Sequence, residues 1–278
     1  MRKRLTDSRT YWRWLLMPLA LFVLALPTAA QDATPPAPDD PPASIWDGTL
    51  RRIRTPILMY HYVSPLPVDA DATRRDLTVS PEQFRAHLEY LFFEGYTPIS
   101  LYDLHDALLT GSPLPAKPVV LTFDDGYSDH YRYVFPALGE YGFTATFFVV
   151  SGFADANLPA HLSWEQIREM ADAGMSIEPH TKDHVELDGR SYDFIVYQTL
   201  GSLESIAYYT GRQPHMFSYP VGRYDDLVLD VLGQMSIWRA VTTQRGALHT
   251  TDNMLEVARI RVPGGASTAA LASILRTP

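Results

Sequence analysis

The chain has no cysteine among its 278 residues. This absence removes disulfide bonds, thiolate metal sites and cysteine nucleophiles together, so any metal must be held by histidine, aspartate or glutamate. Basic residues are also few, with 23 lysines and arginines against 32 acidic residues and a formal net charge of −9. A protein that holds nucleic acid needs a basic face. The charge balance therefore argues against a nucleic-acid partner.

The N-terminal segment lacks an apolar run of the roughly 20 residues that a membrane span needs. Its basic start, Arg2–Arg4, precedes a mostly apolar run at 15–26 and the small residues Thr28–Ala30. This order is typical of a secretory signal peptide over residues 1–30. It predicts a secreted, periplasmic or cell-surface protein, and an uncleaved leader would associate the N-terminus with the membrane.

Residues 31–44 are rich in proline and aspartate and have almost nothing to bury, which predicts a disordered, solvated linker. The remaining residues, 45–278, are predicted to form one domain, since roughly 150 residues per domain is the usual expectation. The 46% hydrophobic content of the chain is normal for a globular protein.

Short apolar runs alternate with helical patterns along this domain. Strands are predicted at 56–63, 96–99, 119–123, 145–150, 176–178, 216–219, 237–242 and 258–262, and helices at 81–95, 101–109, 129–141, 163–174, 191–210, 225–235 and from 267. The alternation predicts a parallel α/β sheet, and the strand count favours a closed or nearly closed barrel over an open, doubly wound sheet. No glycine-rich dinucleotide or phosphate motif follows these strands.

Two adjacent carboxylates, Asp124 and Asp125, follow the predicted strand at 119–123. The carboxyl ends of barrel strands carry the loops in which active sites are built. A purely structural interpretation is an Asp-Gly turn or a helix cap. It does not explain the second aspartate, because two close carboxylates repel each other unless a cation or a proton lies between them.

His180 and His184 follow the predicted strand at 176–178, and their i, i+4 spacing lets both imidazoles point at one metal. Two exposed loop histidines are the alternative. Together with Asp125 they leave a coordination position open, which is the pattern of a catalytic zinc site. After the next strand, Ser218–Gly222 indicates either a simple β-turn or a groove wall whose Val221 N–H can hold an oxyanion.

These motifs resemble those of the polysaccharide deacetylases with a NodB homology domain, carbohydrate esterase family four. The family's first motif, TFDDG, is matched in full at Thr122–Gly126 and its second, H-[ST]-x-x-H, at His180–His184. The third, an R-x-P-Y-G type run, is matched only in part at Ser218–Gly222. The resemblance covers residues 55–262. Ser218 stands where many relatives have an arginine that orients the catalytic aspartate, and Val221 where an aromatic side chain often lines the groove.

The resemblance implies a distorted (β/α)7 barrel that hydrolyses the N-acetyl groups of an acetylated polysaccharide containing N-acetylglucosamine. It assigns Asp124 as general base, the Val221 backbone to the oxyanion hole, and Asp125, His180 and His184 as ligands of zinc, cobalt or nickel. The run Leu58–Tyr62 looks like the Y-H motif of the permuted branch that acts on poly-N-acetylglucosamine, which assigns His61 as general acid. A buried core histidine is the alternative for His61.

Three other functions stay open from the sequence. One is a catalytically silent carbohydrate-binding protein of the cell envelope, although such a protein has no need of a complete metal triad. Another is an O-acetyl esterase acting on a xylan-like glycan. The third is a metal-independent amidohydrolase on the same fold. The predicted export argues against a nucleobase-pathway substrate for such an enzyme.

Overall fold

The computed structural model describes residues 44–277. The predicted signal peptide and almost all of the predicted linker therefore lie outside the described residues. Within the described part, no helix combines the length and the apolar character needed to cross a bilayer.

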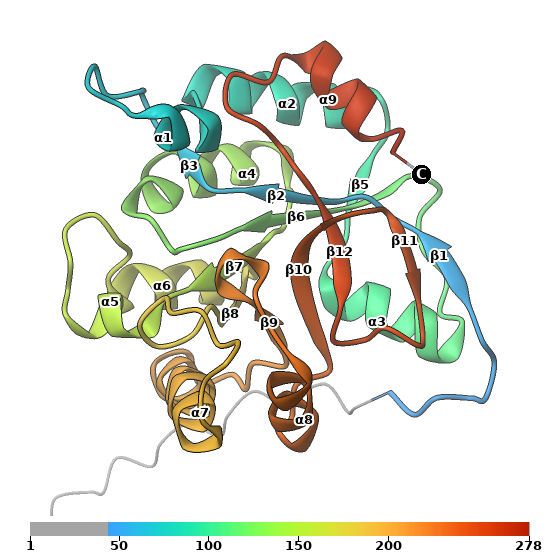
Figure 1. Cartoon of the computed structure of the whole chain (residues 1–278). Helices are drawn as coiled ribbons and strands as arrows, with labels where there is room; N and C mark the ends of the chain where they lie inside the picture. The colour runs from blue at the N-terminus through green and yellow to red at the C-terminus, as the bar shows by residue number, and fades with distance from the viewer. Residues whose placement is uncertain (1–43, 278) are drawn as a thin grey trace, which may run out of the picture. The chain divides into compact units, whose positions relative to one another are not determined.

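A sheet of parallel strands forms the centre of the domain (Figure 1). Its strand order is β8-β7-β6-β2-β12-β10-β9, and the short β5 pairs with the start of β6. The bounds are β2 Ile57–Tyr60, β5 Thr97–Pro98, β6 Pro118–Phe123, β7 Thr146–Val149, β8 Ser176–Pro179, β9 Met216–Ser218, β10 Arg239–Arg245 and β12 Val257–Arg261. Four strands, β2, β6, β7 and β12, meet in the middle and carry buried apolar side chains on both faces, as parallel strands covered by helices do.

The two ends of this strand order, β8 and β9, are joined through a side chain instead of a strand ladder. The Glu178 carboxylate is buried and accepts hydrogen bonds from the backbone N–H groups of His215 (3.1 Å) and Met216 (2.9 Å). Its other oxygen accepts from the hydroxyls of Tyr102 and Ser176, each at 2.8 Å. The predicted, nearly closed parallel barrel is confirmed, and Glu178 bridges its gap.

Helices cover the outside of the barrel, and their ends follow local sequence signals. In α2 (Pro81–Phe93), Ser80 and Gln83 form a capping box, and Phe84 and Leu88 are buried on the inner face. Figure 1 shows α2 beside α9 (Thr268–Ile274). The other helices are α1 Ala72–Leu77, α3 Leu101–Thr110, α4 Phe135–Tyr141, α5 Ser151–Asp155, α6 Trp164–Asp172, α7 Tyr192–Thr210 and α8 Asp226–Gln234.

Several elements differ from the sequence expectation. The predicted helix at 129–141 begins as a π-helical turn, His130–Val134, before α4. Pro136, the second residue of α4, has no N–H for the usual bond to the carbonyl four residues earlier, which disrupts regular α-helical bonding there. The antiparallel pair of β1 (Arg52–Arg54) and β11 (Leu248–Thr250) was not predicted, because strands of three residues are too short to show an apolar period.

Candidate active site and metal centre

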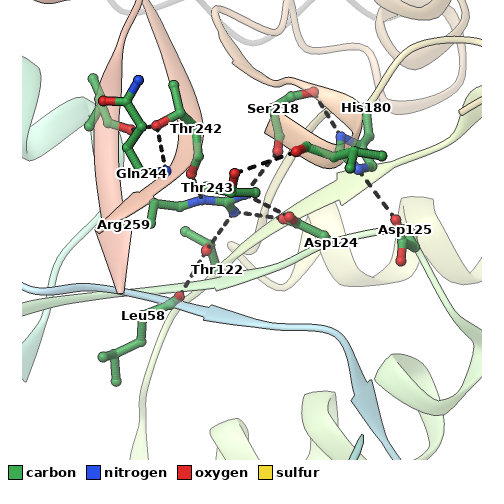
Figure 2. Close-up of polar contacts among 12 residues, drawn as sticks. Leu58, Thr122, Asp124, Asp125, His180, Ser218, Thr242, Thr243, Gln244 and Arg259 are labelled. Atoms are coloured by element: carbon green, nitrogen blue, oxygen red, sulfur yellow. Dashed lines mark hydrogen bonds and ion pairs between the residues drawn. The ribbon is translucent and has the colours of Figure 1, made fainter. Parts of the chain in front are cut away.

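The predicted site residues lie at the carboxyl ends of neighbouring strands. Asp124 and Asp125 directly follow β6, His180 directly follows β8, and the turn containing Val221 follows β9. Figure 2 shows Asp124, Asp125, His180 and Ser218 gathered at this end of the barrel. The barrel therefore brings together segments that are up to about a hundred residues apart in the sequence, as the active-site face of such a fold does.

The three predicted metal ligands form one cluster. One ligand atom from each of Asp125, His180 and His184 lies within 4.8 Å of the others. Asp125 Oδ1 is 3.3 Å from Nε2 of His180 and 3.0 Å from Nε2 of His184. Apart from these two contacts, Asp125 Oδ1 is buried and has no hydrogen-bond partner among the described residues. Two imidazole nitrogens and a carboxylate converging on one point are a donor set that suits a divalent cation.

The orientation of His180 is fixed from the neighbouring strand. Its Nδ1 lies 2.7 Å from the carbonyl oxygen of Ser218 in β9. Because a carbonyl can only accept, Nδ1 carries the proton and the Nε2 lone pair faces Asp125. His180 thus has the tautomer that metal binding requires, and the residues present fit a metal.

Asp124 does not join the metal cluster and pairs instead with Arg259 of β12. The guanidinium donates from Nη1 to Oδ1 and from Nη2 to Oδ2, both at 2.7 Å, and both side chains are buried. Burial alone would raise the pKa of Asp124, but the charge and hydrogen bonds of Arg259 outweigh it and hold that pKa below the usual 3.8. Asp124 is therefore an oriented, ionised carboxylate beside the metal cluster.

Arg259 also explains the serine at position 218. Its Nη2 donates to Ser218 Oγ at 3.2 Å and its Nη1 to Thr122 Oγ1 at 3.1 Å, while Nε donates to the Thr242 carbonyl at 3.0 Å (Figure 2). The guanidinium expected at position 218 is thus supplied from another strand, and Ser218 is small enough to admit it. The sequence reasoning missed Arg259; its signal was a strand with two arginines, Arg259 and Arg261, of which one that is buried must find a partner.

His61 lies between β2 and the short strand β3 (Tyr62–Val63) and is partly exposed. Burial lowers the pKa of its imidazole, and the negative charges of Asp124 and Asp125 act in the opposite direction. The ring therefore lies within electrostatic reach of both carboxylates and is not isolated in the core.

Val221 adopts a left-handed backbone conformation, with φ of 58°, in the turn Pro220–Gly222. Such a conformation is unusual for a β-branched residue. Its N–H has no acceptor among the described residues, and its side chain is 60% exposed. A free N–H beside an exposed side chain is compatible with the predicted oxyanion-binding role.

Backbone strain is concentrated at this site. Five non-glycine residues in the described part of the chain have a positive φ, and all but Asn157 belong to the motifs discussed here: Asp125, Thr181, His184 and Val221. Each such residue costs about 1–3 kcal/mol and persists only where the surrounding structure enforces it. Strain of this kind is common at active sites.

The fold and the site together define a barrel hydrolase with an Asp-His-His centre, and comparisons with known proteins agree. The family model of polysaccharide deacetylases matches residues 111–239. YxkH of Bacillus subtilis (strain 168), whose name places it among the polysaccharide deacetylases, is 33% identical over 84% of this chain and 80% of its own length. The Streptococcus pyogenes deacetylase PplD, solved in complex with acetate, has a TM-score of 0.76 and 29% identity and covers 81% of this chain and all of its own.

A further relative is the poly-β-1,6-N-acetyl-D-glucosamine N-deacetylase of Escherichia coli (strain K12). It is 26% identical over 64% of this chain, which spans about a third (33%) of that protein's length. The chain belongs to the polysaccharide deacetylase family and is a hydrolase acting on carbon–nitrogen bonds other than peptide bonds. The family and the (β/α)7 barrel inferred from the sequence are both confirmed.

Proposed function

We propose that the protein is an exported, metal-dependent deacetylase that removes N-acetyl groups from a polysaccharide containing N-acetylglucosamine. The observation that carries this proposal is the ionised Asp124, held by Arg259, next to the cluster of Asp125, His180 and His184. A base and a metal site side by side are what metal-assisted hydrolysis of an acetamide requires.

Each residue has a defined task in this proposal. A zinc, cobalt or nickel ion held by the cluster would polarise the acetyl carbonyl and lower the pKa of water. Asp124 takes the proton of the attacking water, and the Val221 N–H stabilises the oxyanion that develops on the acetyl oxygen. His61, within electrostatic reach of both aspartates, protonates the leaving amine.

Two considerations support a polymeric N-acetylated substrate. The E. coli relative is named for N-deacetylation of poly-β-1,6-N-acetyl-D-glucosamine, and a B. subtilis relative, 28% identical over 57% of this chain, is named a peptidoglycan-N-acetylmuramic acid deacetylase. Both names favour N-acetyl over O-acetyl groups.

Export is supported by the leader pattern of residues 1–30. N-terminal sequencing of the protein recovered from the cell envelope or the medium tests it, and a mature chain that still begins at Met1 in the cytoplasm would contradict it.

The test of activity is acetate release from N-acetylglucosamine oligomers. We expect wild-type protein loaded with zinc to release acetate and Asp125→Ala to lose both zinc and activity. Asp124→Asn should retain zinc but lose about 10²–10⁴-fold in kcat, the usual contribution of a general base. Asp69→Asn, at an exposed position, is the matched control and should behave as wild type.

The same assay separates the alternatives. A silent carbohydrate-binding protein would bind the oligomers without releasing acetate even at saturating zinc. A metal-independent enzyme would keep full activity after exhaustive metal removal, and that result would refute the proposed role of the cluster.

A further inference from the structure

Two adjoining pockets lie beside the site. One, of about 480 Å³, is lined by residues that include Tyr62, Arg74, Tyr127 and Arg132. The second, of about 440 Å³, shares Ser128, Arg132 and His161 with the first. We call the two together the arginine pocket. None of the functions assigned above uses it.

The arginine pocket is continuous with the catalytic segments. Tyr62 directly follows His61, and Tyr127 comes two residues after Asp125. His161, which lines both pockets, lies beside Tyr127 with the two rings tilted and their centroids 5.2 Å apart. Because Tyr62 and Tyr127 line the pocket, it adjoins the segments that carry His61 and Asp125.

In the arginine pocket, the ring of Tyr62 is covered on both faces, and the Arg74 guanidinium lies over it. Arg74 lies 3.3 Å above the ring centre of Tyr62, and Tyr127 stacks on the same ring at 3.7 Å. Two groups this close cannot share one face of a ring, so both faces of Tyr62 are covered. A sugar cannot stack on Tyr62, and the polar edge of Arg74 is what a ligand meets.

Both arginines are free of ion pairs with the described residues. Arg74 is held by neutral partners, through Nε to Thr78 Oγ1 at 3.1 Å and through Nη2 to Ser64 Oγ at 2.9 Å, which leaves Nη1 without a partner there. Arg132 is exposed and lies in the π-helical turn His130–Val134. Turns of this kind occur frequently at functional sites.

Acidic groups do not cancel this charge. Among the described lining residues, Asp129 is the only carboxylate. Burial raises the pKa of Asp129, and its electrostatic interactions with His130 and Arg74 act in the opposite direction. Even fully ionised, Asp129 balances one of the two arginines. The pocket is thus cationic on a chain whose formal net charge is −9.

We propose that the arginine pocket binds an anionic substituent, a carboxylate or a phosphate, on the sugar next to the one that loses its acetyl group. The inference rests on the deacetylase function proposed above and narrows its substrate to an acetylated glycan with acidic substituents. Arginine suits this task because its planar guanidinium offers paired donors to both oxyanions.

The test compares three oligosaccharides of equal length: one neutral, one with a carboxylate-bearing ether on the neighbouring sugar, and one with a phosphate monoester at the same place. We expect kcat/KM of wild type to be about 10-fold higher for a charged oligomer than for the neutral one, chiefly through KM, because a hydrogen bond between an arginine and an anion adds binding free energy. Whichever charged oligomer gives the larger ratio identifies the source of the anion.

Arg132→Gln and Arg74→Gln should each reduce this charged-to-neutral ratio. Arg212→Gln removes an exposed arginine that lines neither pocket and should leave the ratio unchanged. Equal kcat/KM for all three oligomers in wild type would overturn the proposal, as would an equal effect of Arg212→Gln, which would indicate only the long-range charge of the protein.

Binding measured by calorimetry keeps the two proposals separate. If no oligomer releases acetate, the deacetylase function fails, and the pocket is judged by dissociation constants alone. Tighter binding of a charged oligomer that is lost in Arg132→Gln supports the pocket, and equal dissociation constants refute it. If the neutral oligomer is turned over with no preference for charge, the pocket fails and the function stands.

Discussion

Replacing Arg259 by methionine tests how the site holds its base. Methionine approximates the length of the arginine stem but removes every donor, so Asp124 is left buried without its bidentate partner. Thr122, Ser218 and the Thr242 carbonyl lose their bonds to the guanidinium as well. The change therefore converts a satisfied polar network into an uncompensated buried charge.

The expected cost follows from that burial. Removing one partner of a buried ion pair costs about 3–5 kcal/mol of unfolding free energy, because the remaining charge stays desolvated. Most of this cost should vanish when the charge is removed too. In the double variant Asp124→Asn/Arg259→Met the two losses should therefore not add, and the coupling energy should be about 1–3 kcal/mol, a typical value for residues in one network.

Urea unfolding of wild type, both single variants and the double variant measures this cycle, and acetate release is measured on each. The control is Arg85→Met, which breaks a bidentate pair with Glu140 in which both side chains are about half exposed; its stability should stay close to that of wild type because water solvates the remaining carboxylate. Additive losses in the cycle, or equal losses for Arg85→Met and Arg259→Met, would refute the reasoning.

Two further predictions concern the barrel itself. Glu178→Ala removes the acceptor of the Met216 N–H and one of two acceptors of the His215 N–H, which also donates to the Tyr102 hydroxyl. It should cost about 1–3 kcal/mol in urea unfolding; Glu178→Gln keeps an acceptor and should cost clearly less, and equal costs would contradict the bridging role. His249 is buried, and its pKa is lowered from 6.5 to about 4, mainly by desolvation. Because the unfolded chain binds this proton first, stability should fall by about 3 kcal/mol between pH 6.5 and 4, and His249→Gln should flatten that slope.

The short motifs were enough to predict the cluster of Asp125, His180 and His184 because the sequence itself contains their spacing. Asp125 is set by its place after β6, and His180 and His184 are four residues apart after β8. Parallel strands bring their carboxyl ends to one side of the barrel, so local spacing and strand order together are enough to place the cluster. Its roles in catalysis stay predictions until activity is measured.

Arg259 could not be found in this way. It lies 135 residues from Asp124 in the sequence, and an arginine in a strand pattern does not reveal which carboxylate it meets. The same holds for Arg74 and Tyr62, which come together through the pairing of β3 with β4 (Thr78–Val79). Contacts of this kind depend on tertiary packing, which sequence periodicity does not encode.

The metal centre lies next to the gap between β8 and β9, which links coordination to the closure of the barrel. Glu178 joins these two strands, and directly after β8 the His180 imidazole joins them again through the Ser218 carbonyl. A metal bound to His180 Nε2 would hold that ring, and the ring holds β9. A ligand that binds only the folded state raises the stability of that state by mass action. Zinc should therefore stabilise the junction of β8 and β9 more than the other strands. Amide hydrogen exchange is expected to slow most at Met216 and its neighbours when zinc is added. A uniform effect over all strands would show that metal binding does not act through the junction of β8 and β9.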